Sequence, residues 1–124
     1  MSSYRLLWLA CLIYFVSCSD KETTEASTKY YISTHPINKA KINKLQGSIL
    51  ESHGIYLDSL KRENHLLFAG PLNDTTGMVI YQGPNLETVE MWVRNDPAVK
   101  NELLFYSLSE WNVVIGRSDL QSYQ

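Results

Sequence analysis

The sequence predicts an α+β domain in which two helices cover one face of an antiparallel sheet. Three observations support this fold class. The chain has 124 residues, enough for one domain and too few for two. Short runs rich in β-branched and aromatic residues alternate with longer segments whose apolar residues recur every three or four positions. The expected order is strand, helix, strand, strand, helix, strand, within residues 29–115.

The first strand is expected over residues 29–34, where good strand formers are followed by a stop at His35-Pro36. A long helix is expected over residues 38–62. Its apolar stripe recurs at helical spacing and consists of Ile42, Leu45, Ile49, His53, Tyr56 and Leu60. Because His53 lies on this stripe, we expect its imidazole to face the sheet.

Two short strands are expected at residues 66–69 and 78–82, joined by a loop whose composition suits a hairpin. A second helix is expected to begin at Asn85, a good N-cap residue, and to end at Asp96-Pro97. The Asp96-Pro97 pair is also typical of a helix or turn start. The last strand is expected over residues 103–115, and residues 116–124 are expected to form an exposed tail.

The last expected strand carries apolar side chains on both faces. Leu104, Tyr106 and Leu108 would point one way, and Phe105, Trp111 and Val113 the other. Two helices cover only one face of a sheet, so a second subunit is the natural cover for the other. We therefore expect a homodimer with its sheets packed face to face. The alternative is a monomer whose tail or tether folds over the sheet.

The N-terminus is typical of an exported bacterial protein. An apolar run over residues 6–16 is too short to span a bilayer but suits a signal peptide. The string Phe15-Val16-Ser17-Cys18 resembles a relaxed lipobox. Residues 1–17 are thus expected to be a lipoprotein-type signal peptide, with Cys18 lipidated and residues 18–28 a flexible tether. The expected location is the bacterial cell envelope, on either membrane face. An ordinary secretory signal or an uncleaved anchor are the alternatives.

Composition argues against several other classes of function. The net charge of −2 and the scattered basic residues argue against nucleic-acid binding. The only cysteines, Cys11 and Cys18, lie in or at the end of the leader, so the domain has no thiol for a disulfide or a nucleophile. His35 and His65 lack metal-ligand spacing, and no phosphate-binding loop is present. We expect no metal and no cofactor.

Several local motifs together resemble the YCII (YciI-like) family. They are a His followed by a Tyr-Leu pair in the first helix, a Gly-Pro turn after a strand, a Gly before the next strand, an Asp-Pro turn and a late aromatic residue: His53, Tyr56-Leu57, Gly70-Pro71, Gly77, Asp96-Pro97 and Trp111. The resemblance covers residues 30–115. Asn64-His65 stands where the family usually has Gly, and Asn tolerates the left-handed conformation of such a turn.

This resemblance implies a ferredoxin-like βαββαβ fold that assembles as a dimeric α+β barrel, with an active site built on a His-Asp pair. Family members with an assigned reaction are similar to enzymes that act on small, often aromatic or halogenated compounds, such as dehydrochlorinases. The family is mostly cytoplasmic, so the expected lipid anchor sets this chain apart from it.

His53 and Asp96 are therefore the candidate catalytic pair. A carboxylate on one ring nitrogen leaves the other nitrogen free to accept a proton, as a general base requires. Four aromatic residues are candidates for the lining of an apolar pocket: Tyr56, Phe68, Tyr81 and Trp111. Three alternatives remain open: a histidine that merely satisfies the core, a binding module without turnover, and a structural envelope lipoprotein.

Overall fold

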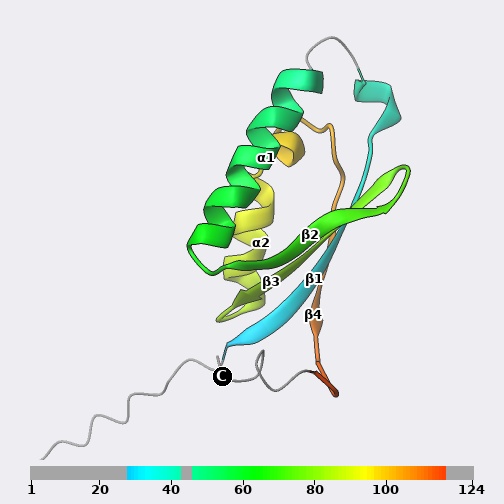
Figure 1. Ribbon diagram of the computed structural model, residues 1–124. Helices are drawn as coiled ribbons and strands as arrows, with labels where there is room; N and C mark the ends of the chain where they lie inside the picture. Colours follow the sequence, from blue (N-terminus) through cyan, green and yellow to red (C-terminus); the bar gives the residue numbers. More distant parts are fainter. Residues whose placement is uncertain (1–27, 43–45, 117–124) are drawn as a thin grey trace, which may run out of the picture.

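The computed structural model describes residues 28–42 and 46–116. The expected signal peptide, Cys18, nearly all of the tether and the tail after Gly116 lie outside the described residues. The described chain is an α+β domain in which a four-stranded antiparallel sheet carries its helices on one side (Figure 1). None of the helices in this part of the chain is long and apolar enough to cross a bilayer.

The sheet has the order β2-β3-β1-β4, with every neighbouring pair antiparallel. The strands are β1 (Lys29–Pro36), β2 (Leu66–Asn73), β3 (Thr76–Gly83) and β4 (Ser107–Trp111). The connection from β1 to β2 passes over β3, and the connection from β3 to β4 passes over β1. This is the predicted ferredoxin-like arrangement, and the fold class is confirmed.

The helical elements are η1 (Lys39–Lys41), α1 (Gln46–Arg62), α2 (Leu86–Asn95) and α3 (Pro97–Lys100). The Oδ1 atom of Asn38 accepts a hydrogen bond from the Ala40 amide at the start of η1. Asn85 caps α2 as predicted, since its Oδ1 accepts from the Thr88 amide at 2.8 Å. The single helix expected over residues 38–62 is instead a short 3₁₀ turn followed by α1.

The core lies between the helices and the inner face of the sheet. Strand alternation turns Tyr31, Ser33 and His35 inward from β1, and all three are buried. They are joined by apolar residues of the other elements, namely Leu60, Leu66, Val79, Tyr81, Val89 and Val93. At Gly83 a Cβ atom would lie 2.6 Å from Cγ2 of Val89, so α2 packs directly against the backbone of β3.

The last strand is much shorter than expected. The amides of Leu103 and Leu104 donate to the Ala98 carbonyl of α3, at 2.9 and 3.1 Å. The Phe105 amide donates to the carbonyl of Pro36, the last residue of β1. These amides close the end of α3 and start a bend, so the ladder of β4 begins only at Ser107.

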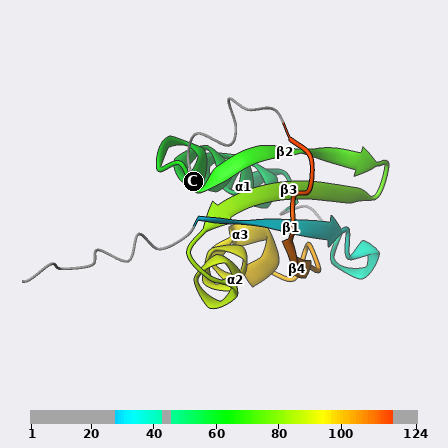
Figure 2. The ribbon, with the colours of Figure 1, turned by 90° about the horizontal axis from the view of Figure 1, so that it is seen from below.

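The outer face of the sheet carries no helix (Figure 2). The strand register places Phe68, Ile80 and Ile32 in one cross-strand row, and Tyr30 beside Trp111 in the next. Phe68 is 56% exposed and Trp111 42%. We call these five residues the outer apolar face. The bulge between Leu66 and Phe68 is what turns Phe68 to this side.

Candidate functional site

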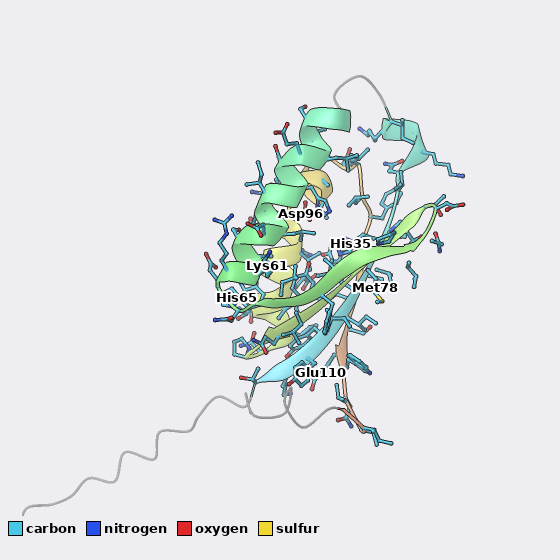
Figure 3. All side chains as sticks on the ribbon, viewed as in Figure 1. His35, Lys61, His65, Met78, Asp96 and Glu110 are labelled. Carbon is cyan, nitrogen blue, oxygen red and sulfur yellow. The ribbon has the colours of Figure 1, made fainter. Side chains whose placement is uncertain are left out.

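His53 and Asp96 lie 43 residues apart in the sequence and meet in the fold. Nδ1 of His53 is 2.7 Å from Oδ2 and 2.9 Å from Oδ1 of Asp96. The carboxylate is fully buried, whereas the imidazole keeps 21% of its side chain exposed. The contact forms because α1 packs beside the junction of α2 and α3, where Figure 3 labels Asp96.

Asp96 is held in place by the backbone around it. Its Oδ1 accepts a hydrogen bond from the Ala98 amide at 2.8 Å, which caps α3, and Pro97 occupies the first position of that helix. Its own amide donates to the Val93 carbonyl at the end of α2. The carboxylate therefore serves as a helix cap and as the partner of His53 at the same time.

This geometry assigns the proton of the neutral imidazole. An ionised carboxylate only accepts hydrogen bonds, so Nδ1 of His53 must carry the hydrogen that it donates to Asp96. Nε2 is then the acceptor nitrogen of the ring.

A cavity of about 460 Å³ opens between α1, β1 and the β2–β3 hairpin, with His53 in its wall. Its lining is mainly aliphatic and includes Ile37, Leu50, Leu57, Pro71, Val79 and Leu104. Three glycines also line it: Gly54, Gly70 and Gly77. A Cβ atom at Gly54 or Gly70 would meet no atom within 4 Å, so missing side chains account for part of the space. A volume of this order suits a small organic molecule.

His35 also lines this cavity, and the sequence did not predict that role for it. Its side chain was expected only to end a strand, but β1 continues through it and it is 2% exposed. Neither of its ring nitrogens has a hydrogen-bond partner among the described residues. Burial lowers the pKa of His35, and the nearby Asp96 carboxylate opposes that shift. The available signal was the alternation Tyr31, Ser33, His35, which puts all three on one face.

None of the four aromatic residues expected in the pocket lines this cavity. The hydroxyl of Tyr56 donates to the Trp92 carbonyl at 2.8 Å, and burial raises the pKa of Tyr56 to about 12. Tyr81 is a core residue whose pKa burial also raises. Phe68 and Trp111 belong to the outer apolar face. Helical and strand periodicity identified side chains that pack, but not the glycine-lined gap where packing stops.

In residues 28–42 and 46–116, no group of three or more His, Cys, Asp or Glu side chains lies close enough together to hold a metal ion. His65 stacks on the ring of Trp92, with ring centroids 4.1 Å apart. It is thus occupied in packing at the far end of α1.

Comparison with solved structures found several similar chains. A 5-chloro-2-hydroxyhydroquinone dehydrochlorinase from Burkholderia phenoliruptrix, in complex with 2,5-dihydroxybenzoquinone, aligns with a TM-score of 0.56 and 19% identity, covering 67% of this chain and 93% of that one. A structural-genomics protein, YJCS, aligns with a TM-score of 0.48 and 18% identity, covering 70% and 99%. A conserved protein of unknown function from Bacteroides thetaiotaomicron aligns with a TM-score of 0.42 and 10% identity, covering 68% of this chain and 95% of that one.

Comparison with curated proteins found no match. The family model of the YCII-related domain, in contrast, matches residues 14–112, which is most of the chain and includes every helix and strand described above. The match begins inside the expected leader. The chain therefore belongs to the family of proteins with a YCII-related domain.

Proposed function

We propose that this protein is an acid–base enzyme acting on a small organic compound, with His53 as the catalytic group and Asp96 as its positioning partner. One observation carries the proposal. The imidazole donates from Nδ1 to a fully buried carboxylate, at 2.7 Å, while the same ring forms part of a cavity wall. A merely structural histidine does not need a ligand-sized space beside it.

In the proposed reaction, Nε2 of His53 removes a proton from an O–H group or an activated C–H group of the bound compound. In an elimination, the electron pair left behind forms a new π bond while a leaving group departs with its own electron pair. In an isomerisation, the proton returns to another atom of the same compound. Asp96 balances the charge on the imidazolium meanwhile. The similarity to a dehydrochlorinase supports an elimination of the first kind. The mainly aliphatic walls lower the local dielectric constant and so strengthen these electrostatic interactions.

The test is turnover of a panel of hydroxylated and halogenated small compounds by the wild type and by His53→Asn. The Asn amide can replace Nδ1–H as a donor to Asp96 but cannot act as a general base. We expect a rate lower by about 10²–10⁴-fold, the usual contribution of a general base. His65→Asn is the matched control, since His65 lies away from the cavity, and it should keep full activity.

The same panel separates the alternatives. Ligand binding by the wild type without any turnover would indicate a binding module that has the fold and the cavity but no chemistry. Neither binding nor turnover would leave a structural role. Equal turnover by the wild type and His53→Asn would refute His53 as the base.

We further propose that a second copy of the chain covers the outer apolar face to form a homodimer. The proposal is supported by the cross-strand apolar rows and by the half-exposed Phe68 and Trp111. Phe68→Glu should convert the dimer to a monomer, measured as molar mass by light scattering. Met91→Glu is the matched control, because Met91 is also 56% exposed but lies on α2. A dimer that survives Phe68→Glu would contradict this assignment.

Location in the bacterial envelope through a lipid on Cys18 remains part of the proposal, supported by the sequence of the leader. Mass spectrometry of the mature N-terminus tests it directly. We expect an acylated Cys18 as first residue, loss of membrane association in Cys18→Ala, and no change in Cys11→Ala. An unmodified N-terminus elsewhere would contradict it.

A further inference from the structure

His35 presents an unusual combination of burial, polarity and position. It is 2% exposed, both ring nitrogens lack partners among the described residues, and its side chain belongs to the cavity wall. Figure 3 labels it on β1, on the side of the sheet that faces α1. Buried polar groups are nearly always hydrogen-bonded, so a histidine in this state calls for a partner that enters the cavity.

The residue opposite His35 on β3 is a glycine, so no side chain from that position packs against it. Gly77 pairs with it across β1 and β3, and a Cβ atom at Gly77 would lie 4.0 Å from Cβ of His35. Gly77 has no positive φ, so a larger residue would fit the strand there. The imidazole therefore adds a polar spot to a wall that is mainly aliphatic and also contains His53, Asn73, Asp74 and Thr76.

We propose that His35 is a ligand-binding residue that recognises a hydroxyl or carbonyl group on a small, uncharged and otherwise apolar compound. This inference rests on the proposed small-molecule function and adds the class of ligand. A neutral imidazole offers one donor and one acceptor, which match a hydroxyl group in either direction and a carbonyl group through the N–H. Burial keeps His35 neutral because it lowers the pKa, although His53 and Asp96 lie near enough to interact with it. The aliphatic lining disfavours a charged ligand.

The test uses three probes of similar size: cyclohexanol, cyclohexanone and methylcyclohexane. Binding is measured by NMR titration of the full chain, with the ring nitrogens of His35 observed by ¹⁵N labelling. The wild type should bind cyclohexanol or cyclohexanone at least about tenfold tighter than methylcyclohexane, the range expected when a buried polar group gains its partner. The ring nitrogens of His35 should shift with that probe and not with methylcyclohexane.

Two variants complete the design. His35→Leu keeps an apolar side chain of similar size and should abolish the preference for the oxygenated probes while methylcyclohexane still binds. Because it removes unpartnered polar atoms, it should unfold at a temperature no lower than that of the wild type. Gly77→Val fills the space beside His35 and should weaken binding of all three probes.

The outcomes separate this inference from the proposed function. A wild type that binds no probe, or shows no preference, overturns the role of His35, as does a preference retained by His35→Leu. If turnover still depends on His53 in that case, the proposed function stands without it. If the preference is present but His53→Asn remains fully active, the catalytic proposal fails and His35 keeps its binding role.

Discussion

Replacing His53 by alanine tests the stability of the pair, because it leaves a buried carboxylate without its main partner. Asp96 has no exposed surface, and its Oδ2 is bonded to His53 alone among the described residues, while Oδ1 also has the Ala98 amide. An uncompensated buried charge costs about 3–5 kcal/mol, and a buried acceptor without a partner about 1–3 kcal/mol. The imidazole is 21% exposed, so water can partly replace it as a partner of Asp96. The expected loss in the free energy of unfolding therefore lies in the lower of these two ranges.

We therefore expect His53→Ala to lower the free energy of unfolding by about 2 kcal/mol, after roughly 0.5 kcal/mol is offset by the better helix propensity of Ala. For a domain of this size that corresponds to a melting temperature lower by about 8–16 °C. His53→Asn should lose about 0.5 kcal/mol or less, because its amide still donates to Asp96.

The assay is urea unfolding followed by circular dichroism, with both variants compared at neutral pH. The pair His65→Ala and His65→Asn is the control, since His65 holds no buried carboxylate and the two should differ by less than about 0.5 kcal/mol. Should His53→Ala and His53→Asn prove equally stable, Asp96 does not depend on His53 and the reasoning fails.

Three further predictions concern other residues. Tyr56→Phe should lower the unfolding free energy by about 1 kcal/mol in urea titrations and leave turnover intact, because the hydroxyl only ties α1 to the Trp92 carbonyl; a large loss of activity would contradict this. Because burial lowers the pKa of His35 below its unfolded value of about 6.5, the unfolded chain takes up the proton first. The contribution of His35 to the free energy of unfolding should be constant above about pH 6.5. Below that pH it should fall by up to about 1.4 kcal/mol per pH unit, until the pKa of His35 in the folded state is passed. Urea titrations at pH 7.5 and 5.5 should show that the free energy of unfolding changes less between the two pH values in His35→Leu than in the wild type. An equal change in both proteins would refute this prediction. Gly83→Ala should destabilise the fold by about 1–3 kcal/mol in the same titrations, since its Cβ would approach Val89 to 2.6 Å; a neutral effect would mean that α2 shifts easily.

Much of the fold could be predicted from local patterns. The element order, the N-cap at Asn85 and the break at Asp96-Pro97 follow from periodicity and from the preferences of capping residues, which act over a few neighbouring positions. The left-handed turn at Asn64 is confirmed, with a φ of 60°. The boundaries of β4 could not be predicted, because the amides of Leu103 and Leu104 bond to a helix whose position only the packed structure sets.

The sequence by itself determined that His53 belongs to the apolar stripe of the first helix, and the resemblance to the family made Asp96 its expected partner. Only the tertiary structure decided that their atoms meet at 2.7 Å, that glycines leave a cavity beside them, and that His35 enters its wall without a partner. The physical reason is that local patterns record which side chains prefer burial, whereas contacts and voids arise from the packing of distant segments, here α1 against the start of α3 and the hairpin of β2 and β3.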